Sequence, residues 1–209
     1  MSAKLPPASL PSGESIVGWF GKIPTRGDFI STLPRIPGQV WDEAISKCLS
    51  AAKATLTVNW PDIWLEAPVW RFALPATMCG PAPLLGLWMP SVDKVGRHFP
   101  LMIATTSPGT TPELMARHGT AWLDAAEDAG RAAIAEDLIP DQLTALIPPP
   151  PDLAAQPDTG LPFNLEPRPG AGLWWTEGSP LVPAHGLVLD TMPDRATFVT
   201  MLDGSRKAP

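Results

Sequence analysis

Proline is the feature that most restricts what this chain can fold into. Of its 209 residues, 28 are Pro and 17 are Gly. Proline lacks a backbone N–H and fixes φ, so regular helices and strands must fit between the prolines. The combined share of Pro and Gly stays below that of disordered or collagen-like chains. Apolar residues make up 44 % of the sequence, which is enough for a sizeable core. We therefore expect one globular domain with proline-stiffened loops.

The prolines also suggest how the chain is divided. Residues 1–14 are rich in Pro and Ser and are expected to form a flexible N-terminus, and residues 204–209 a flexible tail. The folded domain is expected over residues 15–203. Within it, residues 148–169 begin with four consecutive prolines and contain several more. This composition predicts a polyproline-like or disordered insertion and no regular element.

Charge and cysteine content exclude several classes of protein. The net charge is −6, whereas a general nucleic-acid binder needs a positive surface. No stretch of 18 apolar residues is present and no apolar segment follows Met1, so we expect neither membrane insertion nor a signal peptide. Cys48 and Cys79 lack the paired spacing of zinc or redox sites. We expect a protein of the reducing cytoplasm, with no metal and no cofactor.

Apolar periodicity predicts the helices. Residues 40–52 carry an apolar stripe at helical spacing that begins after Pro37-Gly38. A second helix is predicted from the cap Thr111 to about Leu138, with Gly119 and Gly130 as the weak points where a break would occur. Pro140 ends it, and a further short helix is predicted over residues 141–147. The acidic residues of this region are expected to form a solvated face.

Short apolar runs bounded by turn residues predict the strands. They lie at residues 15–20, 69–74, 84–90, 99–105, 172–177, 186–190 and 196–202. Their order among the helices indicates an α/β fold: a single domain with a mixed sheet and helices packed on it, most simply a three-layer α/β/α sandwich. The sequence has 9 Trp and no Tyr, and we expect many of the indole rings to be core pillars or anchors at a partner interface.

One segment has the residue types of a catalytic site. Ser91, Asp93, Arg97 and His98 include a nucleophile, a carboxylate and a base. All four lie within one predicted turn, whereas a catalytic triad needs groups that converge in space. We favour a β-turn whose Asp caps local amides, and keep a small hydrolase or ligand-binding domain as the alternative. His118 is expected to be a packing histidine, and nothing marks His185 as a ligand.

Four stretches of the sequence resemble one family. They are residues 18–29, with Gly-Lys, Pro and then Arg-Gly-Asp-Phe; residues 68–72, with Trp-Arg-Phe; residues 90–101, with Pro-Ser-x-Asp-x-Val-Gly-Arg-x-Phe-Pro-Leu; and residues 173–176, with Leu-Trp-Trp. In this order they resemble the TagF family, also called ImpM, which is associated with bacterial type VI secretion. The resemblance covers nearly the whole chain, from residue 18 to about 202.

The resemblance implies a function. It implies a cytoplasmic, non-catalytic regulator that represses type VI secretion after translation, through contact with the forkhead-associated scaffold protein of that system. Some family members carry a fused phosphatase domain, for which this chain is too short. The family has no agreed catalytic residues, so none is assigned here.

The first and third stretches supply the candidate site. Lys22, Arg26 and Arg97 are cations that, gathered with Asp28, Ser91 and Asp93 at one end of the sheet, would either form a charged patch for a partner or fix the two loops internally. Both interpretations stay open at this point. Arg26-Gly27-Asp28 also spells the tripeptide read by integrins, but three-residue matches are frequent. We expect a Gly-bearing turn flanked by an ion pair instead.

Overall fold

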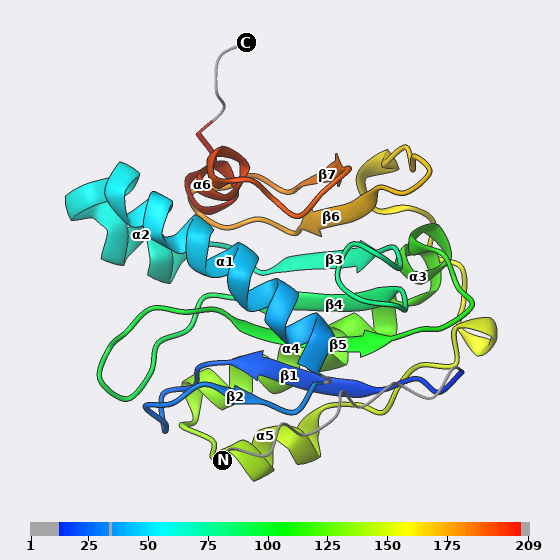
Figure 1. Cartoon of the computed structure of the whole chain (residues 1–209), viewed down its shortest axis with the longest axis horizontal. Helices are drawn as coiled ribbons and strands as arrows, with labels where there is room; N and C mark the ends of the chain where they lie inside the picture. The colour runs from blue at the N-terminus through cyan, green and yellow to red at the C-terminus, as the bar shows by residue number, and fades with distance from the viewer. Residues whose placement is uncertain (1–12, 34, 206–209) are drawn as a thin grey trace, which may run out of the picture.

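The computed structural model describes residues 13–33 and 35–205, apart from the side chains of residues 35–37. Most of the expected flexible N-terminus and tail lies outside the described residues. The described part forms a seven-stranded sheet with helices on both faces (Figure 1). This confirms the expected α/β class and its three layers.

The sheet has the strand order β2-β1-β5-β4-β3-β6-β7. Its strands are β1 (Val17–Gly21), β2 (Ile30–Ser31), β3 (Trp70–Leu74), β4 (Leu84–Met89), β5 (Leu101–Thr106), β6 (Gly172–Thr176) and β7 (His185–Leu189). Every neighbouring pair is antiparallel, so the expectation of a mixed sheet is wrong. The reason is that short loops join β3 to β4, β4 to β5 and β6 to β7, and parallel neighbours need a longer crossover. The helices that lie between strands in the sequence instead join strands that do not pair, and the last helix follows the final strand.

The helices are divided between the two faces. One face is covered by α1 (Arg35–Leu56), α2 (Trp60–Glu66) and α6 (Arg195–Asp203), and the other by α3 (Pro112–His118), α4 (Thr120–Ala135) and α5 (Pro140–Leu146). Figure 1 shows α1 crossing in front of the sheet and α4 behind it. Strand side chains alternate between two cores, so Trp174 packs under α1 whereas Trp175 faces the α3–α5 layer.

The tryptophans are the pillars of both cores. All nine indole rings are buried, and six of them have almost no exposed surface. Trp41 lies 6.1 Å from Trp174 between ring centroids, and both rings pack on Phe72. The interpretation of these rings as core pillars is therefore confirmed. None is left free to anchor a partner on the surface.

Several expected elements are wrong in place or type. Residues 196–202 form helix α6, although their Thr, Phe and Val composition favours a strand. The side chain of Asp194 accepts from Thr197 N at 2.7 Å, and Gly204 ends the helix in the left-handed conformation, so the caps decide the outcome. The strand β2, the short 3₁₀ turn η1 (Thr57–Asn59) and helix α2 were not predicted.

The remaining helices follow the sequence more closely. Helix α1 begins at Arg35 and includes Pro37-Gly38, which were expected to precede it. The helix tolerates this proline because proline in a first turn removes no intrahelical hydrogen bond. The predicted long helix is interrupted at Gly119, as its glycine suggested, and continues through Gly130. The short helix expected after Pro140 is α5.

The Pro-rich segment, residues 148–169, is not disordered. It contains the 3₁₀ turns η2 (Leu153–Ala155) and η3 (Pro162–Asn164) and buries Leu153 and Leu165 in the core beneath α3–α5. Asp158 pairs with Arg117 of α3 at 2.6 Å. The expectation of a disordered excursion is therefore wrong, because apolar residues spaced along the segment anchor it to the domain.

We expect Leu153→Ala and Leu165→Ala each to lower the free energy of unfolding by about 2 kcal/mol, because each removes a buried apolar side chain. Leu146→Ala is the control, since this leucine is 52 % exposed; its effect should stay within about 0.5 kcal/mol. Urea unfolding followed by tryptophan fluorescence measures all three. Wild-type stability in both test variants would show that the segment does not pack on the domain.

Candidate functional site

Two loops meet at one end of the sheet. Strands β1 and β4 are both antiparallel to β5, which lies between them, so they run in the same direction. The loops that follow them, residues 22–29 (the first loop) and residues 90–98 (the second loop), therefore leave the sheet at the same end, at the left of Figure 1. These loops contain all six residues singled out in the sequence.

A buried carboxylate joins the two loops. The side chain of Asp93 has no exposed surface, and that of Lys22 is 6 % exposed. Asp93 Oδ2 accepts from Lys22 Nζ at 2.6 Å and from Arg97 Nε at 2.6 Å. Asp93 Oδ1 accepts from the backbone N–H groups of Val95 at 3.0 Å and Arg97 at 2.8 Å. Both carboxylate oxygens are thus occupied by protein donors.

The second loop is shaped around this carboxylate. Gly96 has φ +79°, in the left-handed region that favours glycine, and its N–H donates to Asp93 O at 2.8 Å. Val92 and His98 form an isolated bridge that closes the turn. The predicted β-turn in which an aspartate caps local amides is confirmed.

Further hydrogen bonds tie the second loop to the first. Ser91 Oγ donates to Lys22 O at 2.8 Å, and Lys94 N donates to Arg26 O at 3.0 Å. Arg97 Nη2 donates to Gly27 O. At the root of the first loop, Gly21 has φ +135°, and a Cβ there would lie 2.1 Å from Pro100 O. The hydrogen bonds make the two loops one joined unit, and only glycine fits at position 21, where the end of β1 approaches the residue that precedes β5.

The electrostatics favour an ionised Asp93. Burial on its own would raise the pKa of this carboxyl group, but the hydrogen bonds from Lys22, Arg97 and Val95 outweigh burial. The pKa of Asp93 is accordingly well below its usual range. A charged carboxylate holds the loops together throughout the neutral pH range.

The side chains do not form a catalytic triad. His98 Nδ1 accepts from Trp60 Nε1 at 3.3 Å, and its ring lies edge-on to Trp60 and Trp64. Burial, followed by the charge of Lys53, lowers the pKa of His98, with Asp93 acting in the opposite direction. The Ser91 hydroxyl is committed to the Lys22 carbonyl. No hydrogen bond joins His98 to Ser91 or Asp93 among the described residues.

The surface hollows also lie elsewhere. Five hollows on the described surface are lined by other residues, and none of the five includes Ser91, Asp93, Arg97 or His98. Nucleophilic catalysis by a serine needs a neighbouring base and a cavity that holds the substrate. The geometry therefore gives the hydrolase alternative no support.

The other two histidines make local contacts. His118 Nδ1 lies 3.0 Å from Gln156 O, in keeping with a packing role, and His185 Nδ1 lies 2.7 Å from Pro183 O at the start of β7. Within the described part of the chain, no group of three or more His, Cys, Asp or Glu side chains is placed to hold a metal ion.

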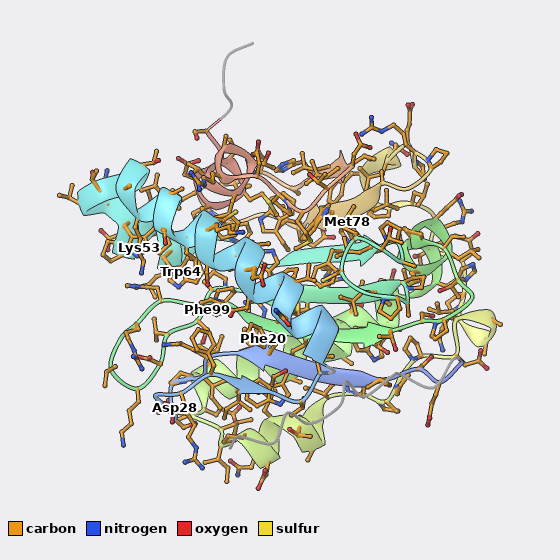
Figure 2. The ribbon with its side chains drawn as sticks, viewed as in Figure 1. Phe20, Asp28, Lys53, Trp64, Met78 and Phe99 are labelled. Carbon is orange, nitrogen blue, oxygen red and sulfur yellow. The ribbon has the colours of Figure 1, made fainter. Side chains whose placement is uncertain are left out.

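An aromatic cluster beneath the loops was missed by the sequence reasoning. Phe29 stacks on Phe20 with 6.0 Å between ring centroids and meets Phe99 edge-on at 4.5 Å, and Lys22 Nζ lies 4.8 Å from the Phe29 ring centroid. Figure 2 places Phe99, Asp28 and the Trp64 of α2 toward this end of the sheet. Phe29 and Phe99 both lie in the quoted motifs, but their convergence depends on strand order.

The six predicted residues divide into two groups. Lys22, Ser91 and Asp93 are buried and hold the loops together, whereas Arg26 and Asp28 are exposed. Neither Arg26 nor Asp28 forms an ion pair within the described residues, so the expected pair flanking Gly27 is wrong. Arg97 has both properties, since its side chain is 61 % exposed while Nε binds Asp93.

A second polar cluster involves the Trp-Arg-Phe strand. The Arg71 side chain is 11 % exposed and pairs with Asp124 at 2.8 Å and Glu127 at 2.9 Å, both on α4. Burial alone would lower the pKa of Arg71, but the hydrogen bonds and charges of the two carboxylates raise it. The predicted solvated acidic face is therefore partly an anchor between α4 and the sheet.

Comparison with known proteins identifies the family. The family model described as the TagF N-terminal domain, type VI secretion system-associated, matches residues 18–148. This chain belongs to the TagF N-terminal domain family. The match includes both loops of the TagF domain and the Arg71 strand, and it ends before the Leu-Trp-Trp strand. The predicted resemblance is thereby confirmed.

A solved structure shares the TagF fold. It is the crystal structure of PA0076 from Pseudomonas aeruginosa PAO1, with a TM-score of 0.71 and 24 % sequence identity over 93 % of this chain and 97 % of that one. At this level of identity the similarity concerns the fold alone. None of the curated proteins with which the sequence was compared matches it significantly.

We expect Asp93→Asn to lower the free energy of unfolding by about 3 kcal/mol at pH 7, because it leaves the buried Lys22 ammonium without its counter-charge. The pKa of Asp93 is lowered in the folded state, so its contribution is present above the unfolded-state pKa of about 3.9 and is lost as the pH falls below it. The difference between wild type and variant should therefore narrow below about pH 4.

Urea unfolding at a series of pH values measures this effect. Asp28→Asn is the matched control, because Asp28 is exposed and forms no ion pair with any described residue, and its effect should stay within about 0.5 kcal/mol at pH 7. A difference between Asp93→Asn and wild type that stays constant down to pH 2 would contradict the role of the Asp93 charge.

Proposed function

We propose that this TagF family member is a non-catalytic regulator that represses type VI secretion by contact with another protein. The observation that carries the proposal is that Ser91, Asp93 and His98 make internal contacts, in a chain whose family is associated with this secretion system. The joined loops therefore present a fixed surface to the solvent.

The partner we propose is the forkhead-associated scaffold protein of the same system, as the family resemblance implies. A rigid pair of loops suits such a contact, because little conformational entropy is lost when a surface is already ordered. The exposed Arg26 and Arg97 belong to a residue type that is enriched at protein interfaces.

We further propose that the protein acts in the cytoplasm, where the scaffold protein is expected. In the described part of the chain, no helix has the length and apolar character needed to cross a membrane. Cys48 and Cys79 are buried, and burial raises the pKa of their thiols to about 11 and about 12. Buried, protonated thiols of this kind are typically unreactive and fit a structural role.

The proposal predicts two results in a bacterium that carries both this gene and the secretion system. Affinity purification of the tagged chain should recover the scaffold protein, and deletion of the gene should raise secretion measured in the culture medium, with restoration by the intact gene. Failure to recover any component of the system, together with unchanged or reduced secretion after deletion, would contradict the proposal.

A matched pair of arginine variants connects the result to the loops. Arg26→Ala should reduce scaffold recovery while the melting temperature stays within about 2 °C of wild type, because the side chain is exposed and unpaired. Arg168→Ala removes an exposed arginine that precedes β6 at the opposite end of the sheet and pairs with the exposed Asp190 at 3.2 Å, and it should leave recovery unchanged. Loss of folding in Arg26→Ala would instead indicate a purely structural role.

A further inference from the structure

The two loops expose a positive surface on an acidic protein. Besides the buried Lys22–Asp93 pair, they carry the three exposed cations Arg26, Lys94 and Arg97 and a single exposed carboxylate, Asp28. Arg26 and Lys94 form no ion pair within the described residues, and the chain as a whole has a net charge of −6. Arg26 and Lys94 are therefore exposed side by side on the joined loops, and no ion pair of the described residues neutralises them.

The connection between α4 and α5 carries two carboxylates next to the loops. Thr25 Oγ1 donates to Leu138 O at 2.8 Å, so the first loop contacts the connection between α4 and α5, which carries Glu136 and Asp137. Neither carboxylate pairs with Arg26 or Lys94 in the described structure. These acids border the positive surface on the α4 side without covering it.

Two large apolar side chains lie on the same loops. Val95 is 70 % exposed at the turn of the second loop, and Phe29 is 49 % exposed at the end of the first. Phe29 is held against Phe20 and Phe99, and Arg97 links the loops through Asp93 and the Gly27 carbonyl. Exposed apolar groups fixed among cations are typical of a binding surface.

We infer that this surface, the cationic loop surface formed by Arg26, Phe29, Lys94, Val95 and Arg97, binds an acidic segment of a protein partner. The segment places Asp or Glu carboxylates against the three cations and an apolar side chain between Phe29 and Val95. The inference rests on the proposed function and adds to it the contact face and the chemistry of the partner.

Charge and size favour an acidic protein segment over other polyanions. Proteins that bind the backbone of nucleic acids typically neutralise several phosphates, and lipid-binding basic clusters contain about four to eight Lys or Arg. The loops supply three exposed cations, and the net charge of −6 repels an extended anionic surface at long range. A short acidic segment matches the three charges without bringing the rest of the chain against a polyanion.

The test compares two double charge reversals. Arg26→Glu with Lys94→Glu reverses the unpaired cations of the surface, whereas Lys47→Glu with Arg195→Glu makes the same change in net charge at exposed positions on α1 and α6. The purified full chain is titrated with the purified scaffold protein at low and high salt. We expect the loop reversal to weaken binding at least about tenfold, the control to stay within about twofold, and wild-type binding to weaken with salt.

A second experiment tests the cationic loop surface independently of the proposed partner. A fluorescently labelled synthetic peptide of sequence Asp-Glu-Asp-Leu-Glu-Asp-Glu should bind the wild type and the control but not the loop reversal. If the scaffold protein does not bind while the peptide does, the proposed partner fails and the surface assignment stands. If the scaffold binds equally to both double variants, the surface assignment fails and the proposed function stands.

A third experiment uses lipid vesicles with and without phosphatidylglycerol, because an anionic lipid surface is the other ligand that could bind these cations. We expect no binding of the wild type to either kind. Binding to the anionic vesicles that the loop reversal abolishes would overturn the assignment to a protein partner. The melting temperatures of both double variants should match that of wild type, because all four side chains are exposed.

Discussion

The arrangement of the two loops depends on one buried carboxylate. Asp93 accepts hydrogen bonds from Lys22, from Arg97 and from two backbone N–H groups, and its side chain has no exposed surface. A charge can be buried at tolerable cost only when it is paired and fully hydrogen-bonded, and here each of its oxygens has protein donors. Because these donors come from both loops, the carboxylate makes one rigid unit from two segments that lie about 70 residues apart in sequence.

This arrangement separates the residues that fix the loops from those that face outward. Lys22, Ser91 and Asp93 are hidden, and with them the groups that a hydrolase would need. Arg26, Lys94 and most of the Arg97 side chain stay exposed on the frame that the hidden residues hold. The two interpretations of the charged residues, a partner surface and an internal network, therefore apply to different members of the same motif.

Much of the fold was predictable from local patterns. The apolar runs at residues 69–74, 84–90, 99–105 and 172–177 are strands, and the stripe over residues 40–52 lies on a helix. The sequence-based predictions were wrong where the local residue types favoured one structure and the caps or the packing imposed another. Residues 196–202 have strand-forming side chains but are helical between the Asp194 cap and Gly204, and the Pro-rich segment is anchored by Leu153 and Leu165. The sequence also could not predict whether neighbouring strands are parallel or antiparallel, because that depends on which strands become neighbours.

By itself, the sequence determined the family, the α/β class and the turn built on Asp93 and Gly96, since these depend on residue types at close spacing. Only the tertiary structure decided that Lys22 meets Asp93, that Phe29 packs on Phe99, and that His98 turns to Trp60 and away from Ser91. The reason is that β5 lies between β1 and β4. Strand order is a long-range property of the packed sheet, and it brings together side chains that local patterns cannot relate.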